Sequence, residues 1–326
     1  MGLALKLLTS SAFMMAAALV LSLITNFAGI FPSTVLTTNV TANLTIILLA
    51  VMMTISLSRI PSKDLSPKNN VRSLVRALVI GLFIASAVPI IGYLLLKDSS
   101  YSDYAKGLVF VAATPFAASV APLSFILRGD MEHAARSTIY VYIAALLWIP
   151  FIVYVLLGAT VNMKDLIITV IEVIGVPLVA SRFITKVKMD KVKMAVILNC
   201  IIGFLVWMSV SATDFSLPMK FIMAFLLIGL LRTFGLGNAI EIVERRAGIH
   251  WSQRVTDILM MSYKNKGIAI ALCVSTMGPL TRYAMVAIAV SVIAETCWVV
   301  FMDSALFSKR RMKRELQKEG SEVSDL

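Results

Sequence analysis

The stretch Ser262–Gly267 places two lysines and an asparagine in the middle of a long apolar segment. Apolar residues lead up to it from Ile258 and resume at Ile268. A charged side chain at the centre of a bilayer costs about 2.5–3.5 kcal/mol on the most lenient insertion scale, so such residues usually face a cavity, a partner helix or a substrate path. Lys264 and Lys266 are therefore the first candidates for binding a substrate or a coupling ion.

A second apolar segment, residues 109–124, contains two prolines. Pro115 and Pro122 have no amide hydrogen to donate, and each disfavours a helical conformation of the residue before it. Backbone that opens inside a membrane is tolerated only where it lines a cavity or is buried in protein. We therefore expect both interrupted segments to form the substrate region, with these residues: Thr114, Pro115, Ser119, Ser262, Lys264 and Asn265.

These features also have structural explanations, which the sequence leaves open. One proline can kink a helix that is otherwise regular and packed. A buried lysine generally has a charged partner, and for Lys264 or Lys266 that partner would be Glu295 or Asp303 on the next segment. Glu172, near the middle of another segment, would either relay protons or be hydrogen-bonded to a neighbouring helix. We keep four coupling or charge-pair candidates: Lys264, Lys266, Glu295 and Glu172.

The remaining polar residues predict positions rather than chemistry. Arg232 is expected near enough to the membrane surface for its long side chain to reach water. Asp257 is expected to cap the start of a helix, and His133 and His250 to lie in solvated loops. With two histidines and none of the short motifs typical of phosphate binding, metalloprotease or serine hydrolase chemistry, the sequence predicts no enzyme and no metal site.

The composition excludes a soluble globular protein. Only 15% of the 326 residues are charged and 59% are hydrophobic, whereas soluble domains have about 25% charged residues. The predicted fold class is therefore an all-α polytopic membrane protein. The apolar runs are long enough for ten transmembrane helices, at residues 8–30, 41–60, 72–96, 105–127, 134–158, 163–185, 193–211, 217–236, 255–276 and 282–306.

Most of the 30 lysines and arginines fall on alternate connections between these runs. The positive-inside rule then places both termini on the cytoplasmic side, and we expect the plasma membrane. Because orientation in the membrane accounts for the net charge of +12, the sequence gives little reason to expect a nucleic-acid partner. It does not specify the oligomeric state.

Five runs lie before Ala159 and five after it, and the interrupted segment is the fourth of each set. An odd number of spans per unit inverts the second unit relative to the first, as in secondary transporters whose interrupted helices mark the binding site. We expect one transmembrane domain, residues 1–307, made of repeats 5–158 and 161–307. The charged tail, residues 308–326, is expected to fray from the last helix into cytoplasmic solvent.

Three motifs lie in or beside these segments: Thr114-Pro-Phe-Ala-Ala-Ser119, Leu127-Arg-Gly-Asp130, and Lys264-Asn265 followed by Gly267-Ile-Ala-Ile-Ala. They resemble motifs of the bile acid:sodium symporter family, a group of organic-anion carriers whose relatives include arsenite exporters and auxin-type carriers. The resemblance implies ten helices, with spans 1, 2, 6 and 7 in a panel and the other six in a core. It also implies that discontinuous fourth and ninth helices cross where substrate and sodium bind.

The chain departs from this family where sodium would bind. In a gapless alignment, Val120 and Ala121 stand where sodium-coupled members have a Ser-Asn pair, and Met260 and Lys264 stand where they have Glu and Gln. Sodium needs oxygen ligands, and an ammonium would repel it. We infer that Lys264 substitutes for the bound sodium as a fixed positive charge. This argues against sodium as a cofactor and leaves proton coupling through Lys264 and Glu295, exchange and facilitated diffusion as alternatives.

The predicted function is a secondary transporter of a small organic anion, surrounded by membrane lipids and working by alternating access. Arsenite export is disfavoured, because residues 109–124 contain no cysteine. Two other classes remain as alternatives: a cation/proton antiporter of similar fold, and a membrane receptor that binds a solute without transporting it. Cation-dependent proton movement without an anion would indicate the antiporter, and binding without flux would indicate the receptor.

Overall fold

The computed structural model describes residues 3–30, 38–60, 71–185 and 190–319 of the chain. These ranges consist of helices and short connections and contain no strand, and one isolated antiparallel bridge joins Phe116 to Lys264. The all-α fold class is confirmed for this part of the chain. Two of the connections that carry lysines, residues 61–70 and 186–189, lie outside it.

The first half of the described chain contains α1 (Leu3–Thr9), α2 (Ser11–Phe27), α3 (Asn39–Ser58), α4 (Val71–Leu78), the π-helical turn η3 (Val79–Ile84), α5 (Ala85–Leu96), α6 (Ser102–Ala113), α7 (Val120–Ile126), α8 (Met131–Leu157) and the 3-10 turn η4 (Gly158–Thr160). The second half contains α9 (Met163–Val170), π-helical η5 (Ile171–Gly175), α10 (Val176–Phe183), α11 (Lys191–Ser211), α12 (Met219–Leu230), π-helical η6 (Leu231–Gly235), α13 (Leu236–Arg246), α14 (Trp251–Ser262), α15 (Lys266–Thr276), 3-10 η7 (Gly278–Leu280), α16 (Thr281–Phe301), π-helical η8 (Met302–Leu306) and α17 (Lys309–Lys318).

Seven helices in these ranges are long and apolar enough to cross a membrane: Val40–Ser58, Val71–Leu96, Met131–Thr160, Met163–Phe183, Val192–Ser211, Met219–Arg246 and Gly278–Leu306. The other three predicted spans correspond to shorter helices. Segments 105–127 and 255–276 are each divided in two, so that no helix within them exceeds 12 residues. The first predicted span contains α2, whose 17 residues fall short of the about 20 that a perpendicular crossing takes.

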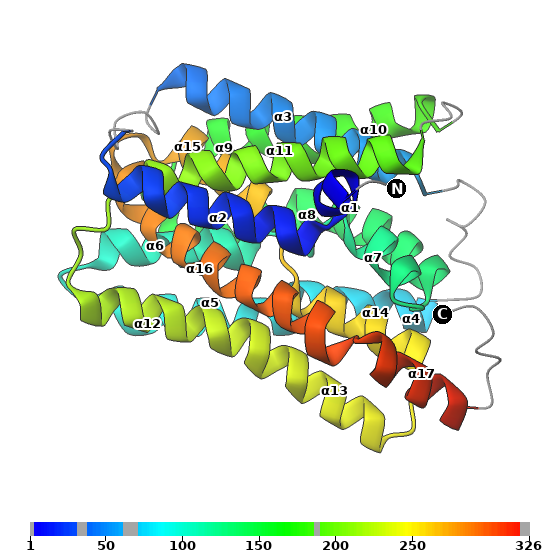
Figure 1. The fold of residues 1–326 in the computed structure, drawn as a ribbon. Coiled ribbons are helices and arrows are strands. Elements are labelled where there is room, and N and C mark those ends of the chain that lie inside the picture. Colours follow the sequence, from blue (N-terminus) through cyan, green and yellow to red (C-terminus); the bar gives the residue numbers. More distant parts are fainter. Residues whose placement is uncertain (1–2, 31–37, 61–70, 186–189, 320–326) are drawn as a thin grey trace.

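The central helix of the bundle is α16. In Figure 1, α2, α3 and α11 lie along one side of the molecule, and α5, α12 and α13 lie along the opposite side. α2 packs against α11 and α3 against α10, whereas α16 packs against α6 and α12. The most apolar stretch of α16 is 72% buried, against 22–44% in the other six long spans. The helix that carries Glu295 is therefore surrounded mainly by protein.

α6 and α16 approach each other so closely that one contact requires glycine. A methyl group added at Gly107 of α6 would lie 1.9 Å from the carbonyl oxygen of Ala284 and 3.1 Å from the Ala287 side chain, both on α16. The first of these neighbours is backbone and cannot turn aside. Small residues allow membrane helices to pack closely. This contact fixes α6, which leads into the first interruption, against the central helix.

The charged tail begins with a docked helix. The carboxylate of Glu315 on α17 is buried and accepts a hydrogen bond of 2.8 Å from Arg254 of α14. Burial alone would raise the pKa of this carboxyl, but the hydrogen bond from Arg254 and the surrounding positive charges outweigh burial and leave the pKa below its usual value. The expectation of fraying is therefore wrong for residues 309–319, because ion pairs dock them. Residues 320–326 lie outside the described part.

We predict that Gly107→Ala destabilises the bundle, because the added methyl group forces α6 away from α16. Overpacking of this kind costs about 1–3 kcal/mol, more than the roughly 1 kcal/mol that alanine gains over glycine in a helix. The melting temperature of the detergent-solubilised variant should fall. Gly203→Ala is the matched control, since its methyl group would meet nothing closer than 3.7 Å. Equal melting temperatures for the two variants would contradict the packing.

Candidate functional site

The first interruption follows from Pro115. α6 ends at Ala113, and Thr114 has an extended conformation, with φ −71° and ψ 147°. This is the conformation that a following proline favours. Helical structure resumes only at Val120 of α7. The predicted break in this segment is confirmed, and it is more than a kink.

The second interruption contains no proline. α14 ends at Ser262 and α15 begins at Lys266, and between them Tyr263 and Asn265 have ψ values of 87° and 89°. Asn265 caps α15, because its side-chain oxygen accepts a hydrogen bond of 3.1 Å from the amide of Ile268. Asparagine is among the preferred residues at a helix N-cap. The predicted break in this segment is confirmed as well.

The two interruptions meet as a short antiparallel bridge. The amide of Ala117 donates to the carbonyl of Tyr263 at 2.8 Å, and the amide of Asn265 donates to the carbonyl of Pro115 at 2.9 Å. Each broken helix thus supplies partners for backbone groups that the other has freed, as a membrane interior demands. We call residues 114–117 and 263–265 the crossing point.

The ammonium group of Lys264 lies among oxygens behind this bridge. The residue is 1% exposed. Its Nζ atom donates to four oxygens: Thr114 O at 2.6 Å, Ser86 Oγ at 2.9 Å, Ala112 O at 3.1 Å and Gly81 O at 3.2 Å. An ammonium has three donors, so all of them are engaged here. The carbonyls come from the open end of α6 and from the π-helical turn η3, so Lys264 ties these two elements to the second interruption.

A second buried cluster contains Lys266, Glu295 and Arg232. One carboxylate oxygen of Glu295 lies 2.8 Å from Lys266 Nζ and 2.5 Å from Arg232 Nη2. Arg232 also donates to the carbonyl of Ser262 at 3.0 Å. The expectation that Arg232 reaches water is therefore wrong: η6 packs against α14 and α16, and the residue is 1% exposed. Of the two partners considered for the lysines, Glu295 is the one that Lys266 contacts.

Tyr142 of α8 supports both interruptions from a third helix. Its hydroxyl donates to the carbonyl of Phe116 at 2.8 Å and accepts from the side-chain amide of Asn265 at 2.8 Å. The residue is buried. One phenol therefore bridges the two broken segments, next to the backbone bonds that join them.

Four of the six predicted substrate residues belong to the crossing point: Thr114, Pro115, Lys264 and Asn265. The hydroxyls of Thr114 and Ser262 donate to carbonyls of their own helices, at 3.1 Å and 2.6 Å. Ser262 adjoins the crossing point and also accepts a hydrogen bond of 2.8 Å from Trp298. Ser119, whose hydroxyl oxygen is buried, precedes α7. Substrate binding by these residues stays a prediction.

Four other residues with a predicted position lie away from the crossing point. Glu172 is exposed on η5 and takes no part in the hydrogen bonds of the crossing point. Asp257 is buried within α14 rather than at its start, and His133 is buried within α8 rather than in a loop, so these two expectations are wrong. His250 does precede α14, with a side chain that is 80% exposed.

A family model described as the sodium bile acid symporter family matches residues 41–229, which is more than half of the chain. The chain belongs to the sodium bile acid symporter family. Membership, together with the apolar helices, makes it an integral membrane protein and indicates a transporter rather than an enzyme. The match includes the first interruption and ends before the second. A comparison with curated proteins gave no match.

The name of the sodium bile acid symporter family raises the question of whether these residues could hold sodium. Three carbonyls and a hydroxyl, the set around Lys264, are oxygen ligands of the kind that hard cations take. The ammonium already lies within 2.6–3.2 Å of all four. Like charges repel strongly at such distances in a buried site. A sodium ion does not fit among these oxygens while the lysine is charged.

Reasoning from the sequence missed four residues of the site: Gly81, Ser86, Tyr142 and Arg232. Gly81 and Ser86 supply acceptor oxygens from an otherwise apolar span, where small residues are too common to signal a role. Tyr142 and Arg232 gave a weak signal, as a phenol and a guanidinium within apolar runs. Only the fold shows that all four face the interruptions.

We predict that Tyr142→Phe lowers the melting temperature of the detergent-solubilised protein. The variant leaves the buried carbonyl of Phe116 without a donor and removes an acceptor from Asn265, which costs about 1–3 kcal/mol. Tyr154→Phe, on the same helix, is the control, because that residue is 63% exposed. If both variants melt with the wild type, the phenol does not support the crossing point.

Proposed function

We propose that the protein is a secondary transporter of a small organic anion, that it works by alternating access, and that it needs no sodium. In this proposal the ten predicted spans form inverted repeats 5–158 and 161–307, with both termini in the cytoplasm and the plasma membrane as the host. The helices α2, α3, α10 and α11 would form the panel. The packing of α2 on α11 and of α3 on α10 supports this division.

The observation that supports an anionic substrate is an excess of buried positive charge. Lys264, Lys266 and Arg232 are 1%, 8% and 1% exposed, and Glu295 is the carboxylate that contacts two of them among the described residues. A buried charge without a counter-charge is strongly unfavourable. An organic anion bound beside the crossing point would supply the missing negative charge.

Lys266 and Arg232 are better placed than Lys264 to meet that anion. The donors of Lys264 are engaged by its four oxygens. Lys266 has one ion-pair partner and is the most exposed of the three cations, while Arg232 Nε is buried and donates no hydrogen bond within the described ranges. A carboxylate could take up these donors. Lys264 would then act as a positioning residue that holds the crossing point together.

Lys264 is also the feature that supports sodium independence. A sodium ion bound between α6 and η3 would supply one positive charge and join carbonyl oxygens of both elements. The ammonium of Lys264 supplies the same charge and contacts carbonyl oxygens of both elements. Because the ammonium is part of the chain, its occupancy does not depend on the sodium concentration.

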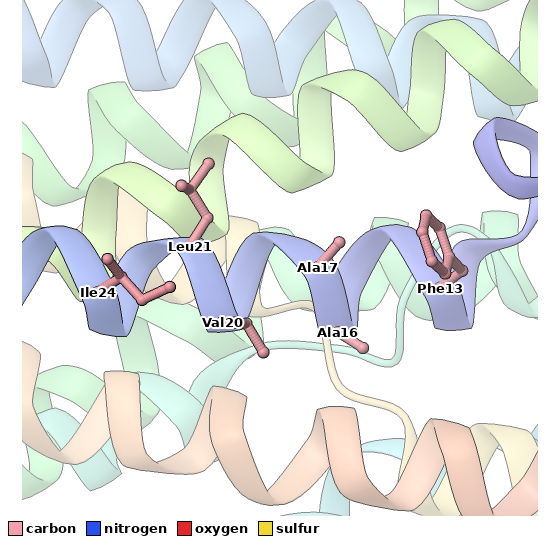
Figure 2. Close-up of a pocket in the computed structure, with 6 residues that line it drawn as sticks. All are labelled: Phe13, Ala16, Ala17, Val20, Leu21 and Ile24. Carbon is pink, nitrogen blue, oxygen red and sulfur yellow. The ribbon is translucent and has the colours of Figure 1, made fainter. Parts of the chain in front are cut away.

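An open groove along α2 is proposed to contact lipid. Figure 2 shows its six lining residues, all of them on this helix. They are all apolar: Phe13, Ala16, Ala17, Val20, Leu21 and Ile24. The groove therefore has no group that could bind the charge of an anion, and it suits an acyl chain of the surrounding bilayer.

Uptake into proteoliposomes tests the proposed function. The labelled probes are pyruvate, succinate, benzoate and taurocholate, each offered in sodium buffer and in choline buffer. We predict that at least one is accumulated, at the same rate in both buffers. Uptake that requires sodium would contradict the substitution by Lys264. Without uptake of any probe, cation-dependent proton movement would favour the antiporter, and binding alone would favour the receptor.

We predict that Lys264→Ala abolishes uptake of the transported probe while the protein still inserts and is expressed. The variant removes the donors from four buried oxygens and the charge that holds the interruptions together. Lys164→Ala is the matched control, because Lys164 is exposed at the start of α9. Undiminished uptake by Lys264→Ala would remove this residue from the mechanism.

A further inference from the structure

A second group of titratable side chains gathers within the bundle, apart from the crossing point. We call it the carboxyl cluster: Arg76 of α4, His133 of α8, Glu244 of α13 and Asp257 of α14. Asp257 is fully buried, and Glu244 and His133 are each 4% exposed. The side chain of Arg76 is 31% exposed. The cluster is therefore enclosed except where Arg76 reaches the surface.

One guanidinium serves both carboxyl groups. Nη2 of Arg76 lies 2.8 Å from Oδ2 of Asp257 and also donates a hydrogen bond to Oε1 of Glu244. Because both carboxyl groups lie against the same nitrogen atom, they are close neighbours in a buried site. Two carboxylate ions cannot hydrogen-bond to each other, because neither carries a donor. A proton on one of them would supply that donor.

The buried acceptors of the cluster also call for a donor. Oδ1 of Asp257 and Oε2 of Glu244 accept no hydrogen bond from the described part of the protein, whereas Oδ2 of Asp257 has the Arg76 guanidinium 2.8 Å away. A buried acceptor left without a donor is strongly unfavourable, and more so when it is charged. A protonated Glu244 would donate to Asp257 and remove this penalty.

The neighbouring groups do not balance the negative charge of a second carboxylate. His133 Nδ1 lies 2.5 Å from the Ser73 hydroxyl, and its Nε2 lies 3.6 Å from Asp257, beyond hydrogen-bond distance. The other charged residues that flank the cluster on α8, α13 and α14 are engaged outside it or exposed: Glu132 pairs with Arg136, Glu241 with Arg254 and Arg245 with Glu315, and Arg246 is exposed. Apart from the histidine, the cluster holds one cation and two carboxyl groups, and one bound proton balances these three charges.

We propose that Glu244 and Asp257 bind one proton between them and that this proton is the coupling ion of the transporter. The coupling role rests on the proposed function. The proton attaches to a carboxylate oxygen, with water as its source on the side where Arg76 is exposed. Its release leaves two carboxylates on one guanidinium.

Asp257 and its ion-pair partner Arg76 lie on two helices, α14 and α4, and each helix leads toward Lys264. Asp257 lies five residues before the end of α14, which is about 8 Å along the helix, and α14 ends at the crossing point. Arg76 lies the same number of residues before Gly81, whose carbonyl accepts from Lys264. Two carboxylates that share one guanidinium in a buried site repel each other. Release of the proton would therefore push α13 and α14 apart and displace the chain that enters the crossing point.

Proton binding can be measured on the detergent-solubilised full-length protein without any substrate. Infrared spectra over a pH titration should show the carbonyl band of a protonated carboxyl, which disappears as the pH rises. Glu244→Gln and Asp257→Asn should each lose this transition. Glu132→Gln, whose side chain is 65% exposed in the wild type, should retain it. A transition that persists unchanged in either cluster variant that folds would overturn the proposal.

Transport gives the second readout. With the probe that the wild type accumulates, an imposed pH gradient should stimulate uptake by the wild type and by Glu132→Gln. Glu244→Gln should lose that stimulation completely and keep exchange of the probe without a gradient. If the gradient stimulates uptake by Glu244→Gln as it does uptake by the wild type, the proposed coupling role is wrong, whereas the proposed transport of an anion is unaffected. If no probe is transported although the infrared transition is present, the carrier and the coupling role fall together.

Discussion

Backbone groups that are freed where two helices break inside the membrane are the constraint on which the rest of the structure depends. Two hydrogen bonds between the broken segments satisfy part of this demand, and the ammonium of Lys264 satisfies carbonyls of α6 and η3. An ammonium suits this place, because it is compact and presents three donors in diverging directions. The approach of η3 is close enough that a methyl group at Gly81 would lie 2.7 Å from the Phe116 ring.

The choice of a lysine at this position has consequences for charge. In the proposed mechanism this side chain takes the place of an exchangeable cation, and with Lys266 and Arg232 it leaves the centre of the bundle more positive than Glu295 can balance. The carboxyl cluster has the opposite excess, with two carboxyl groups on one guanidinium. α14 connects the two regions. An anion at one region and a proton at the other would each bring its surroundings closer to neutrality, which gives both the same physical basis.

The sequence predicted those features of the site that depend on local chemistry. Pro115 predicts a break in its helix, and the lysines in an apolar run predict a position that does not face lipid. The positions of Arg232, Asp257 and His133 could not be predicted, because their burial results from ion pairs and hydrogen bonds between helices that are distant in sequence. The docking of α17 was missed for the same reason. A hydrogen bond from Arg254 to Glu315 holds this helix, and its sequence has no apolar stripe that would predict docking. The count of ten spans and the inverted repeat remain predictions.

An experimental structure determined in sodium-rich buffer, with a transported carboxylate present, tests the central claim most directly. The account predicts the Lys264 ammonium among the oxygens of Gly81, Ser86, Ala112 and Thr114, with no metal density there and with the carboxylate beside Lys266 and Arg232. A sodium ion bound among those four oxygens, with the lysine side chain displaced from them, would contradict it.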